Sequence, residues 1–367
     1  VKFELGVLYY KLKSYDAADF EARYDMARGR LVGQGTYGKV YKTYDKKRRK
    51  FVAIKFVTPT THDYTDAGYR EVIILAALRP CKRYLPCLLD AFEIGNEVAI
   101  VSDFVDGTNL HQLFAMYRNM QQSLPLTKSF KIARDLLTAL QSIHAADIVH
   151  NDIKAANIVY SSHADRPVVL DFGLGCVTAA NFDDVAQNFQ LPREFSAEGG
   201  EEARAWSRDA SPSGSPGRDS SNDSVSAAQK EAERHRLLVD LYEIGIQCTQ
   251  NTLREATYVA PDRREASYSR FSLDTDELYL FLRSSDVYCM GIVFAEMFTV
   301  PGEFDSRFTL DDYGGKETML PDWYTPEMFL PPGGAGGAAD DVGLGLLLMV
   351  REMLAPNSYR RLTAAQA

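Results

Sequence analysis

The distribution of apolar residues divides the chain into a strand-rich first part and a helix-rich second part. Short apolar runs, separated by charged or glycine-containing turns, predict β-strands at 40–44, 51–55, 88–92 and 97–104. Beyond these runs the apolar residues recur at helical spacing, most clearly over 126–146. The pattern therefore predicts an α+β protein in which strands precede most of the helices.

Shorter periodic segments predict the remaining helices, at 16–24, 70–78, 285–294 and 342–354. A length of 367 residues is too great for one ordinary domain, so we expect two lobes. We place an N-terminal extension at 1–24, a β-rich antiparallel lobe with one helix at 25–105, and a larger, mainly helical lobe at 106–367.

We expect an insert at about 178–250 in the larger lobe. Residues 207–226 include eight serines and no aromatic residue, so this stretch cannot bury enough surface to order itself. We expect residues 196–230 to be disordered. The segment is either phosphorylated at the Ser-Pro pairs that begin at Ser211 and Ser215, or it is an inert spacer. Apolar residues return at helical spacing near the end of 225–248, which predicts a helix that docks again on the lobe.

Composition and charge exclude several classes of function. The hydrophobic fraction of 46% provides for a sizeable core, and the net charge of −9 disfavours general nucleic-acid binding. We find no apolar run of about 18 residues and no opening signal peptide, so we expect no membrane association. The five scattered cysteines form no CxxC pair and predict no disulfide framework, which favours a reducing intracellular compartment, cytoplasmic or nuclear. Because the sequence opens at Val1 and stops within a helical pattern, we expect a piece of a longer protein.

The residues most suggestive of chemistry lie at 148–173. Asp152, Lys154 and Asn157 follow one another closely, and Asp171 comes after two apolar runs that predict a small hairpin of buried strands. The hairpin would bring Asn157 and Asp171 together, and their oxygens suit Mg²⁺. Asp152 could accept a hydroxyl proton, and Lys154 would place a positive charge near a phosphoryl group.

A glycine-rich segment, with Gly33, Gly35 and Gly38, precedes the first predicted strand pair. A Rossmann dinucleotide loop has similar spacing but requires a helix directly after the glycines. Here a strand, a charged turn and a second strand follow, which favours a glycine-rich hairpin folded over phosphates.

The second strand of this pair ends at Lys55, and Glu71 lies 16 residues downstream within an apolar helix. An unpaired carboxylate there would be costly to bury. A pairing of Lys55 with Glu71 accounts for both residues, whereas a solvated strand end accounts for neither.

These motifs, in this order from Leu31 to the end of the chain apart from the insert, resemble those of the eukaryotic protein kinases. The resemblance implies a two-lobed kinase fold with ATP and Mg²⁺ as cofactors. If the roles known in that family apply to the matching positions here, Asp152 orients and deprotonates the acceptor hydroxyl and Lys154 stabilises the transferring phosphoryl group. Asn157 and Asp171 would then hold Mg²⁺. The remaining ATP-site positions implied are Gly33, Gly35, Gly38, Val40, Ala53, Lys55 (paired with Glu71), Asp103, Val105 and Val159.

Later landmarks support the resemblance and also depart from it. Asp286 lies in the predicted central helix and would brace the catalytic loop, and His144 and His150 are expected to be packed structural residues. Asn151 replaces the usual arginine before the catalytic aspartate.

Two further departures lie in the activation segment. Glu255 replaces a threonine that contacts the catalytic residues, although Thr252 or Thr257 could substitute. Asp262 replaces the glutamate of the Ala-Pro-Glu motif and could still pair with Arg361.

Lysine two residues after the catalytic aspartate is the serine/threonine-kinase pattern, so we expect transfer of the γ-phosphate to Ser/Thr hydroxyls of protein substrates.

The hinge between the lobes is expected at 103–105, with the small Ser102 directly before it. The segment Thr58-Pro59-Thr60-Thr61-His62, the flanks at 148–150 and 158–160 and the long insert resemble the cell-division-cycle-seven kinases, which use an activator subunit; a divergent kinase outside that group is the alternative. The alternative function is a pseudokinase or scaffold that binds partners without catalysis; the filled catalytic positions favour an active enzyme.

Overall fold

The computed structural model describes residues 12–35, 38–58, 62–178, 248–249, 252, 260–268, 273–299, 338–355 and 357–367. Most of the predicted insert, with its disordered stretch, Ser-Pro pairs and docking helix, lies outside these residues, as do Glu255 and Thr257. The chain divides into two compact units and passes from the first to the second after Tyr69 and again after Val101. The lobe boundaries expected from the sequence stay a prediction.

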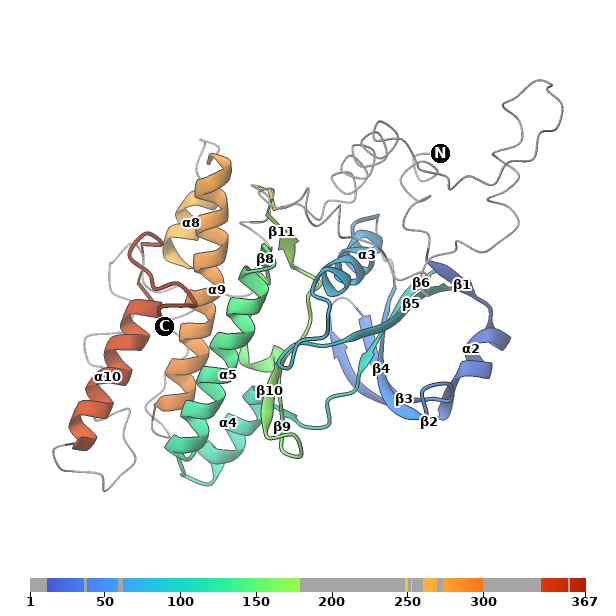
Figure 1. Ribbon diagram of the computed structural model, residues 1–367, viewed down its shortest axis with the longest axis horizontal. Helices are drawn as coiled ribbons and strands as arrows, with labels where there is room; N and C mark the ends of the chain where they lie inside the picture. The colour runs from blue at the N-terminus through green and yellow to red at the C-terminus, as the bar shows by residue number, and fades with distance from the viewer. Residues whose placement is uncertain are drawn as a thin grey trace, which may run out of the picture. The chain divides into compact units, whose positions relative to one another are not determined.

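The first unit is built on a six-stranded sheet with the order β1-β5-β6-β4-β3-β2 (Figure 1). Strands β2, β3 and β4 pair antiparallel, whereas β1 runs parallel to β5. The four predicted strands are confirmed as β3, β4, β5 and β6, whereas β1 and β2 were not predicted. The bounds are β1 Lys13–Tyr15, β2 Tyr24–Gly35, β3 Gly38–Asp45, β4 Lys50–Val57, β5 Leu88–Ile94 and β6 Glu97–Asp103.

The predicted helix at 16–24 is confirmed as α2 (Ala17–Arg23), and it belongs to the core of this unit. Its first turn is capped by Asp16, whose side chain accepts a hydrogen bond from the Asp19 amide. Phe20 and Tyr24 pack in one cluster with Val52, Ile54, Phe92, Ala99 and Val101. The segment before the glycine-rich loop is therefore part of the sheet's hydrophobic core.

A buried ionic network fastens the end of α2 to the sheet. Arg23 forms ion pairs with Asp90 at 2.5 Å and with Asp45 at 3.6 Å, and both carboxylates are almost fully buried. The hydroxyl of Tyr24 donates to Asp90 at 3.0 Å. Buried carboxylates of this kind require a partner, and Arg23 supplies it.

The second unit is mainly helical. Its strands form two small sheets, β10-β9-β7 and β11-β8, and Figure 1 shows α5 and α9 running side by side with α10 packed against α9. The helix predictions at 126–146, 285–294 and 342–354 are confirmed, with shifted ends. The bounds are β7 Thr108–Asn109, α4 Leu110–Asn119, α5 Leu126–His144, β8 Ile148–Val149, η1 Ala155–Asn157, β9 Ile158–Ser161, β10 Arg166–Val169, β11 Cys176–Val177, α8 Pro261–Tyr268, α9 Thr275–Phe298 and α10 Ala338–Met353.

The predicted helix at 70–78 is longer than expected, since α3 spans His62–Ala77. Helix α9 corrects another expectation, because its length and composition would suffice to cross a membrane. However, 83% of its most apolar window is buried within the structure, as in the core helix of a folded lobe.

The prediction of no disulfide framework was wrong. Disulfides join Cys81 to Cys87 and Cys176 to Cys248, and Cys289 is a buried free thiol. Pairing depends on the approach of Cα atoms in space, here 5.0 Å in both pairs, and sequence spacing does not encode that approach. The argument from cysteines for a reducing compartment therefore fails.

Candidate active site

The predicted hairpin at 158–170 is confirmed and brings Asn157 and Asp171 to the same end. Strands β9 and β10 pair antiparallel, with Ile158 opposite Val169, and the amide of Leu170 donates to the Asn157 carbonyl at 2.8 Å. Consecutive apolar residues in both strands, rather than an alternating pattern, explain why most of their side chains are buried. An amide oxygen and a carboxylate at one end are hard donors of the kind that Mg²⁺ prefers.

Asp152, Lys154 and Asn157 form one hydrogen-bonded group in the loop between β8 and β9. The Lys154 ammonium donates to Asp152 Oδ2 at 2.8 Å, and Asn157 Nδ2 donates to the same oxygen at 2.9 Å. Asn157 Nδ2 also donates to the Asp152 carbonyl at 2.9 Å. Because the amide nitrogen of Asn157 is used twice within the loop, its oxygen is the atom left to coordinate a cation.

The second carboxylate oxygen of Asp152 is a buried acceptor without a hydrogen-bond partner among the described residues. Asp152 is 5% exposed, and a buried carboxylate oxygen is costly when it accepts no hydrogen bond. A substrate hydroxyl that donates to this atom would remove that cost. The arrangement therefore fits a residue that orients a hydroxyl and takes up its proton.

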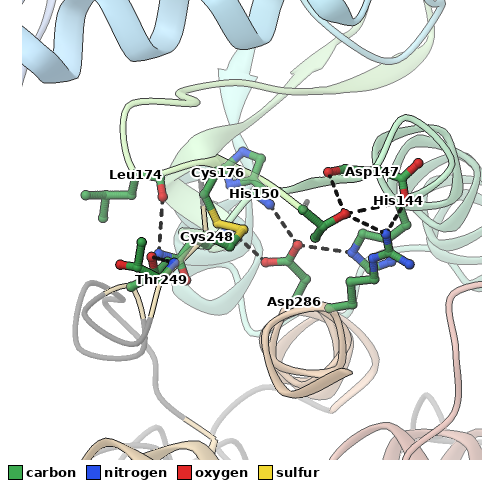
Figure 2. The surroundings of a disulfide bond; sticks show 12 residues. His144, Asp147, His150, Leu174, Cys176, Cys248, Thr249 and Asp286 are labelled. Atoms are coloured by element: carbon green, nitrogen blue, oxygen red, sulfur yellow. Dashed lines mark hydrogen bonds and ion pairs between the residues drawn. A yellow bond between two sulfur atoms is a disulfide. The ribbon is translucent and has the colours of Figure 1, made fainter. Parts of the chain in front are cut away.

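Asp286 of α9 supports the catalytic loop from below, as predicted. Its carboxylate oxygens accept hydrogen bonds from the backbone amides of His150 and Asn151, each with an N···O distance of 2.8 Å. One of these oxygens also lies 3.1 Å from His144 Nε2 (Figure 2). Burial opposes its ionisation, but the hydrogen bond and charge of His144 hold the pKa of Asp286 below its ordinary value. An ionised acceptor thus fixes the backbone just ahead of Asp152.

His150 is a packed residue of defined tautomer. The Asp152 amide donates to its Nδ1 at 3.2 Å, so the proton resides on Nε2, which lies 3.1 Å from the Leu170 carbonyl oxygen. Complete burial lowers the pKa of His150, against the opposing charges of Asp286, Asp152 and Asp171. The neutral ring therefore links the catalytic loop to the end of β10. The expectation of structural histidines is confirmed for this residue and for His144.

Asn151 joins the catalytic loop to the segment after Asp171. Its side-chain nitrogen donates to the Leu174 carbonyl at 3.1 Å. The backbone has φ of 67°, a left-handed conformation that asparagine tolerates better than most residues. The residue is neutral and 2% exposed, so the contact is a hydrogen bond between uncharged groups.

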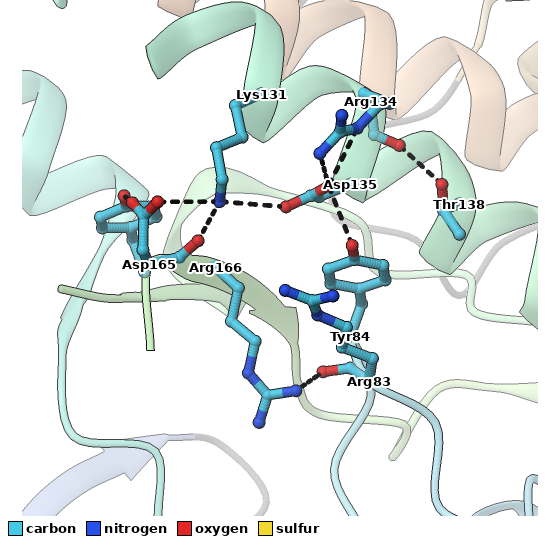
Figure 3. A network of polar contacts seen from close by, with 9 residues as sticks. Arg83, Tyr84, Lys131, Arg134, Asp135, Thr138, Asp165 and Arg166 are labelled. Atoms are coloured by element: carbon cyan, nitrogen blue, oxygen red, sulfur yellow. Dashed lines mark hydrogen bonds and ion pairs between the residues drawn. The ribbon is translucent and has the colours of Figure 1, made fainter. Parts of the chain in front are cut away.

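A second polar network holds the hairpin of β9 and β10 against α5 (Figure 3). Lys131 pairs with Asp165 at 3.2 Å and with Asp135 at 3.5 Å, and Asp135 accepts the Tyr84 hydroxyl at 3.0 Å. The carbonyl of Tyr84 in turn accepts the amide of Val169 at 3.0 Å. Since these contacts surround β10, they fix the strand that leads to Asp171.

The glycine-rich segment forms a β-hairpin, which excludes the Rossmann alternative. Strand β3 follows the glycines directly, with Gly35 opposite Gly38. Gly38 has φ of 154°, and a Cβ at this position would collide with the backbone carbonyl oxygen of Phe56. Only glycine fits there without strain.

The remaining predicted ATP-site residues lie on elements of both units. Val40 and Ala53 are on the paired strands β3 and β4, and Lys55 is opposite Val40. Glu71 is a buried residue of α3, and Asp103 ends β6. Val105 follows Asp103, and Val159 lies on β9 opposite Val168. Lys55 and Glu71 fall in different units, so their pairing stays a prediction, as does the ATP site.

The Ala-Pro-Asp motif is attached to the end of the chain, as predicted. Arg361 pairs with Asp262 Oδ1 at 3.0 Å, and the Ser358 amide donates to Asp262 Oδ2 at 2.6 Å. Arg361 also donates to the Ala355 carbonyl at 2.8 Å. Aspartate therefore satisfies the arginine despite its shorter side chain. The hydroxyl of Thr252 accepts a hydrogen bond from the Thr249 amide at 2.9 Å, which stabilises the turn between these two residues. The prediction that Thr252 takes the place of the missing threonine at position 255 stays untested.

Sequence reasoning missed a cluster beside the catalytic loop. The Thr178 amide donates to the Asp147 carbonyl at 2.8 Å, and Arg283 of α9 bonds both the Asp147 carboxylate and the Thr178 hydroxyl (Figure 2). Asp147 has φ of 54° in the turn after α5. An aspartate just past a helical pattern is a turn signal, but its partners are distant in sequence and could not be inferred.

Comparison with known proteins agrees with this geometry. Residues 26–198 match the family described as protein kinase domain. Among curated relatives, extracellular signal-regulated kinase 7 of Drosophila melanogaster is 32% identical, over 44% of this chain and 17% of its own length. Serine/threonine-protein kinase 10 of Danio rerio is 30% identical, over 39% of this chain and 14% of its own length. Human dual specificity tyrosine-phosphorylation-regulated kinase 3 is 28% identical, over 42% and 26%.

The fold, the loop geometry and these matches support a eukaryotic-type protein kinase, and the strand-rich sheet and helices fit the two-lobed α+β fold of that family. The similarity to the cell-division-cycle-seven kinases is not confirmed by the comparisons. The matches span only about a sixth of the length of the first two relatives.

Proposed function

We propose that the protein transfers the γ-phosphate of ATP to serine and threonine hydroxyls of protein substrates. The observation that carries this proposal is the Asp152 group: one carboxylate oxygen is held by Lys154 and Asn157, and the other is a buried acceptor. A substrate hydroxyl bound to that second oxygen would be oriented for attack and relieved of its proton.

Each chain residue has a defined part in this mechanism. Lys154, 2.8 Å from Asp152, would lie beside the transferring phosphoryl group and offset its negative charge. Lys55 would bind the phosphates nearer the adenosine while paired with Glu71. Asn157 and Asp171 would hold Mg²⁺, which neutralises phosphate charge when bound. Catalysis then consists mainly of positioning and electrostatic stabilisation.

The finer assignments follow from this proposal. Lysine at 154 favours serine and threonine acceptors, although one group of relatives is named dual specificity kinases. We assign an intracellular location because the reaction consumes ATP, and protein substrates as partners. An activator subunit is consistent with the neutral Asn151, which could not bind a phosphorylated loop by charge.

The test is Mg-ATP-dependent phosphorylation of a generic basic protein, followed by phosphoamino-acid analysis. Lys55→Met and Asp171→Ala should each abolish transfer while the protein stays folded, since each removes a functional charge rather than core packing. Lys50→Met, an exposed change on the same strand as Lys55, should leave turnover unchanged. Unchanged turnover in both active-site variants would contradict the kinase mechanism. Nucleotide binding without turnover in the unaltered protein would favour the scaffold.

A further inference from the structure

Two cysteines far apart in sequence meet beside the catalytic loop. Cys176 lies in β11, just after Asp171, and Cys248 lies 72 residues later. Their disulfide joins the two described ends of the segment 178–248, which includes most of the insert (Figure 2).

The first of these cysteines lies in a strand that pairs with the strand leading into the catalytic loop. Strand β11 pairs antiparallel with β8, with Cys176 opposite Val149 and Val177 opposite Ile148. His150 follows β8 immediately. The position of β11 therefore affects the start of the loop that holds Asp152.

The second cysteine fixes where the chain returns. The Cys248 amide donates to the Val177 carbonyl at 2.9 Å. A few residues on, the carbonyl of Thr252 accepts Arg263 at 2.6 Å, and Arg263 also donates to Ser285 of α9 at 3.0 Å. The disulfide thus sets the end of the activation segment against both the catalytic loop and the helical core.

The sulfurs lie in an apolar setting. Cys176 and Cys248 are 2% and 4% exposed, and they pack with Val149, Ala266, Leu278, Tyr279 and Leu282. Two reduced thiols would suit the same cluster, because free cysteine behaves as a small apolar side chain. Reduction therefore leaves the core intact and removes only the covalent restraint on the segment.

We propose that Cys176 and Cys248 are a reversible thiol–disulfide site that regulates phosphoryl transfer, with the oxidised form the more active one. The proposal rests on the kinase function proposed above. An intracellular disulfide, if formed, is usually transient or redox-sensing rather than structural. Opening the bond removes the loop-closure restraint between the two cysteines, so β11 and Cys248 are held less firmly against β8 and the start of the catalytic loop.

The reductant is a dithiol, either a small molecule or a protein with two vicinal cysteines. Its thiolate attacks one sulfur of the disulfide and forms a mixed disulfide, which releases the other cysteine as a thiol after proton uptake. The second thiol of the reductant then displaces the remaining cysteine. Two electrons and two protons pass to Cys176 and Cys248, and the reductant leaves as a disulfide. Because both sulfurs are buried, attack requires local opening of this segment.

The experiment compares the unaltered protein with and without dithiothreitol. Mass spectrometry of the unreduced protein should find a peptide that links Cys176 to Cys248. Dithiothreitol should speed hydrogen exchange at 148–150 and 176–177 and lower turnover about fivefold or more. The Cys176→Ala/Cys248→Ala variant should show both changes without reductant and respond no further. The matched Cys81→Ser/Cys87→Ser variant should still respond.

Two results would overturn the proposal. One is the absence of the linked peptide from protein kept under oxidising conditions. The other is unchanged exchange at 148–150 after the bond has been reduced. Both measurements use the unaltered protein and neither requires catalysis. If they give the expected result while no preparation transfers phosphate, the redox site stands and the kinase function fails.

Discussion

Replacing Asp286 with asparagine should weaken both the fold and the catalytic loop. The carboxylate accepts two backbone amides at 2.8 Å and contacts His144, and each hydrogen bond to a charged group contributes about 1.5–3 kcal/mol. Asparagine keeps one oxygen, so one backbone amide of the pair loses its acceptor and meets the new NH₂ group. The lost bond and the unsatisfied buried amide together give a destabilisation of about 3–5 kcal/mol.

The assay is urea denaturation together with hydrogen exchange at the amides of His150 and Asn151. We expect a lower denaturation midpoint, faster exchange at these two amides and reduced turnover. Asp276→Asn, an exposed change near the start of the same helix, is the matched control and should alter none of them. Protected amides at 150 and 151, with a loss of stability below about 1 kcal/mol, would refute the reasoning.

The same residue predicts a dependence on pH. The pKa of Asp286 is lower in the folded protein than its ordinary value of 3.8, so the folded state binds a proton less readily than the unfolded state. Its contribution to stability is therefore fully present above the unfolded-state pKa and is lost as pH falls through the folded-state pKa. The asparagine variant should lack this component, so the stabilities of the two proteins should converge in acid. A constant difference between the two from neutral pH to pH 2 would contradict this assignment.

Three other predictions follow from residues outside this helix. Arg23→Ala should cost about 3 kcal/mol because it leaves the buried carboxylate of Asp90 without its ion pair, whereas the exposed Arg28→Ala should cost under about 0.5 kcal/mol in the same denaturation assay. Because Asn151 is neutral, activity should survive phosphatase treatment, and a large loss would contradict this. Ser102→Phe should weaken ATP-site inhibitors with bulky aryl groups at least about tenfold at an unchanged KM for ATP; equal inhibition would place Ser102 outside the pocket.

Features encoded by neighbouring residues could be predicted from the sequence. The hairpin of β9 and β10 follows from two apolar runs around a short polar connector, and α5 follows from its 3.6-residue periodicity. The pairing of Asp262 with Arg361, which lie far apart in sequence, was predicted from the resemblance to the protein kinases rather than from local pattern.

Features that depend on distant segments were missed or remain open. Strand β1 has only three residues, and its pairing with β5 depends on how α2 turns the chain back. The disulfide between Cys176 and Cys248 needs two segments 72 residues apart to meet on α9. Pairing across such separations is set by the whole fold rather than by local pattern. The pairing of Lys55 with Glu71 also stays a prediction, because the two residues fall in different units.

The position of β1 at one edge of the large sheet has a practical consequence for producing this protein. A fragment cut at residue 26, where the match to the kinase family starts, would lack β1, α2 and Arg23. Strand β5 would then become the edge strand of the sheet. Its unpaired backbone amides and carbonyls could then pair with strands of other molecules. Such a fragment should form aggregates during expression, whereas a protein that keeps Leu12 and the residues after it retains its own protective strand.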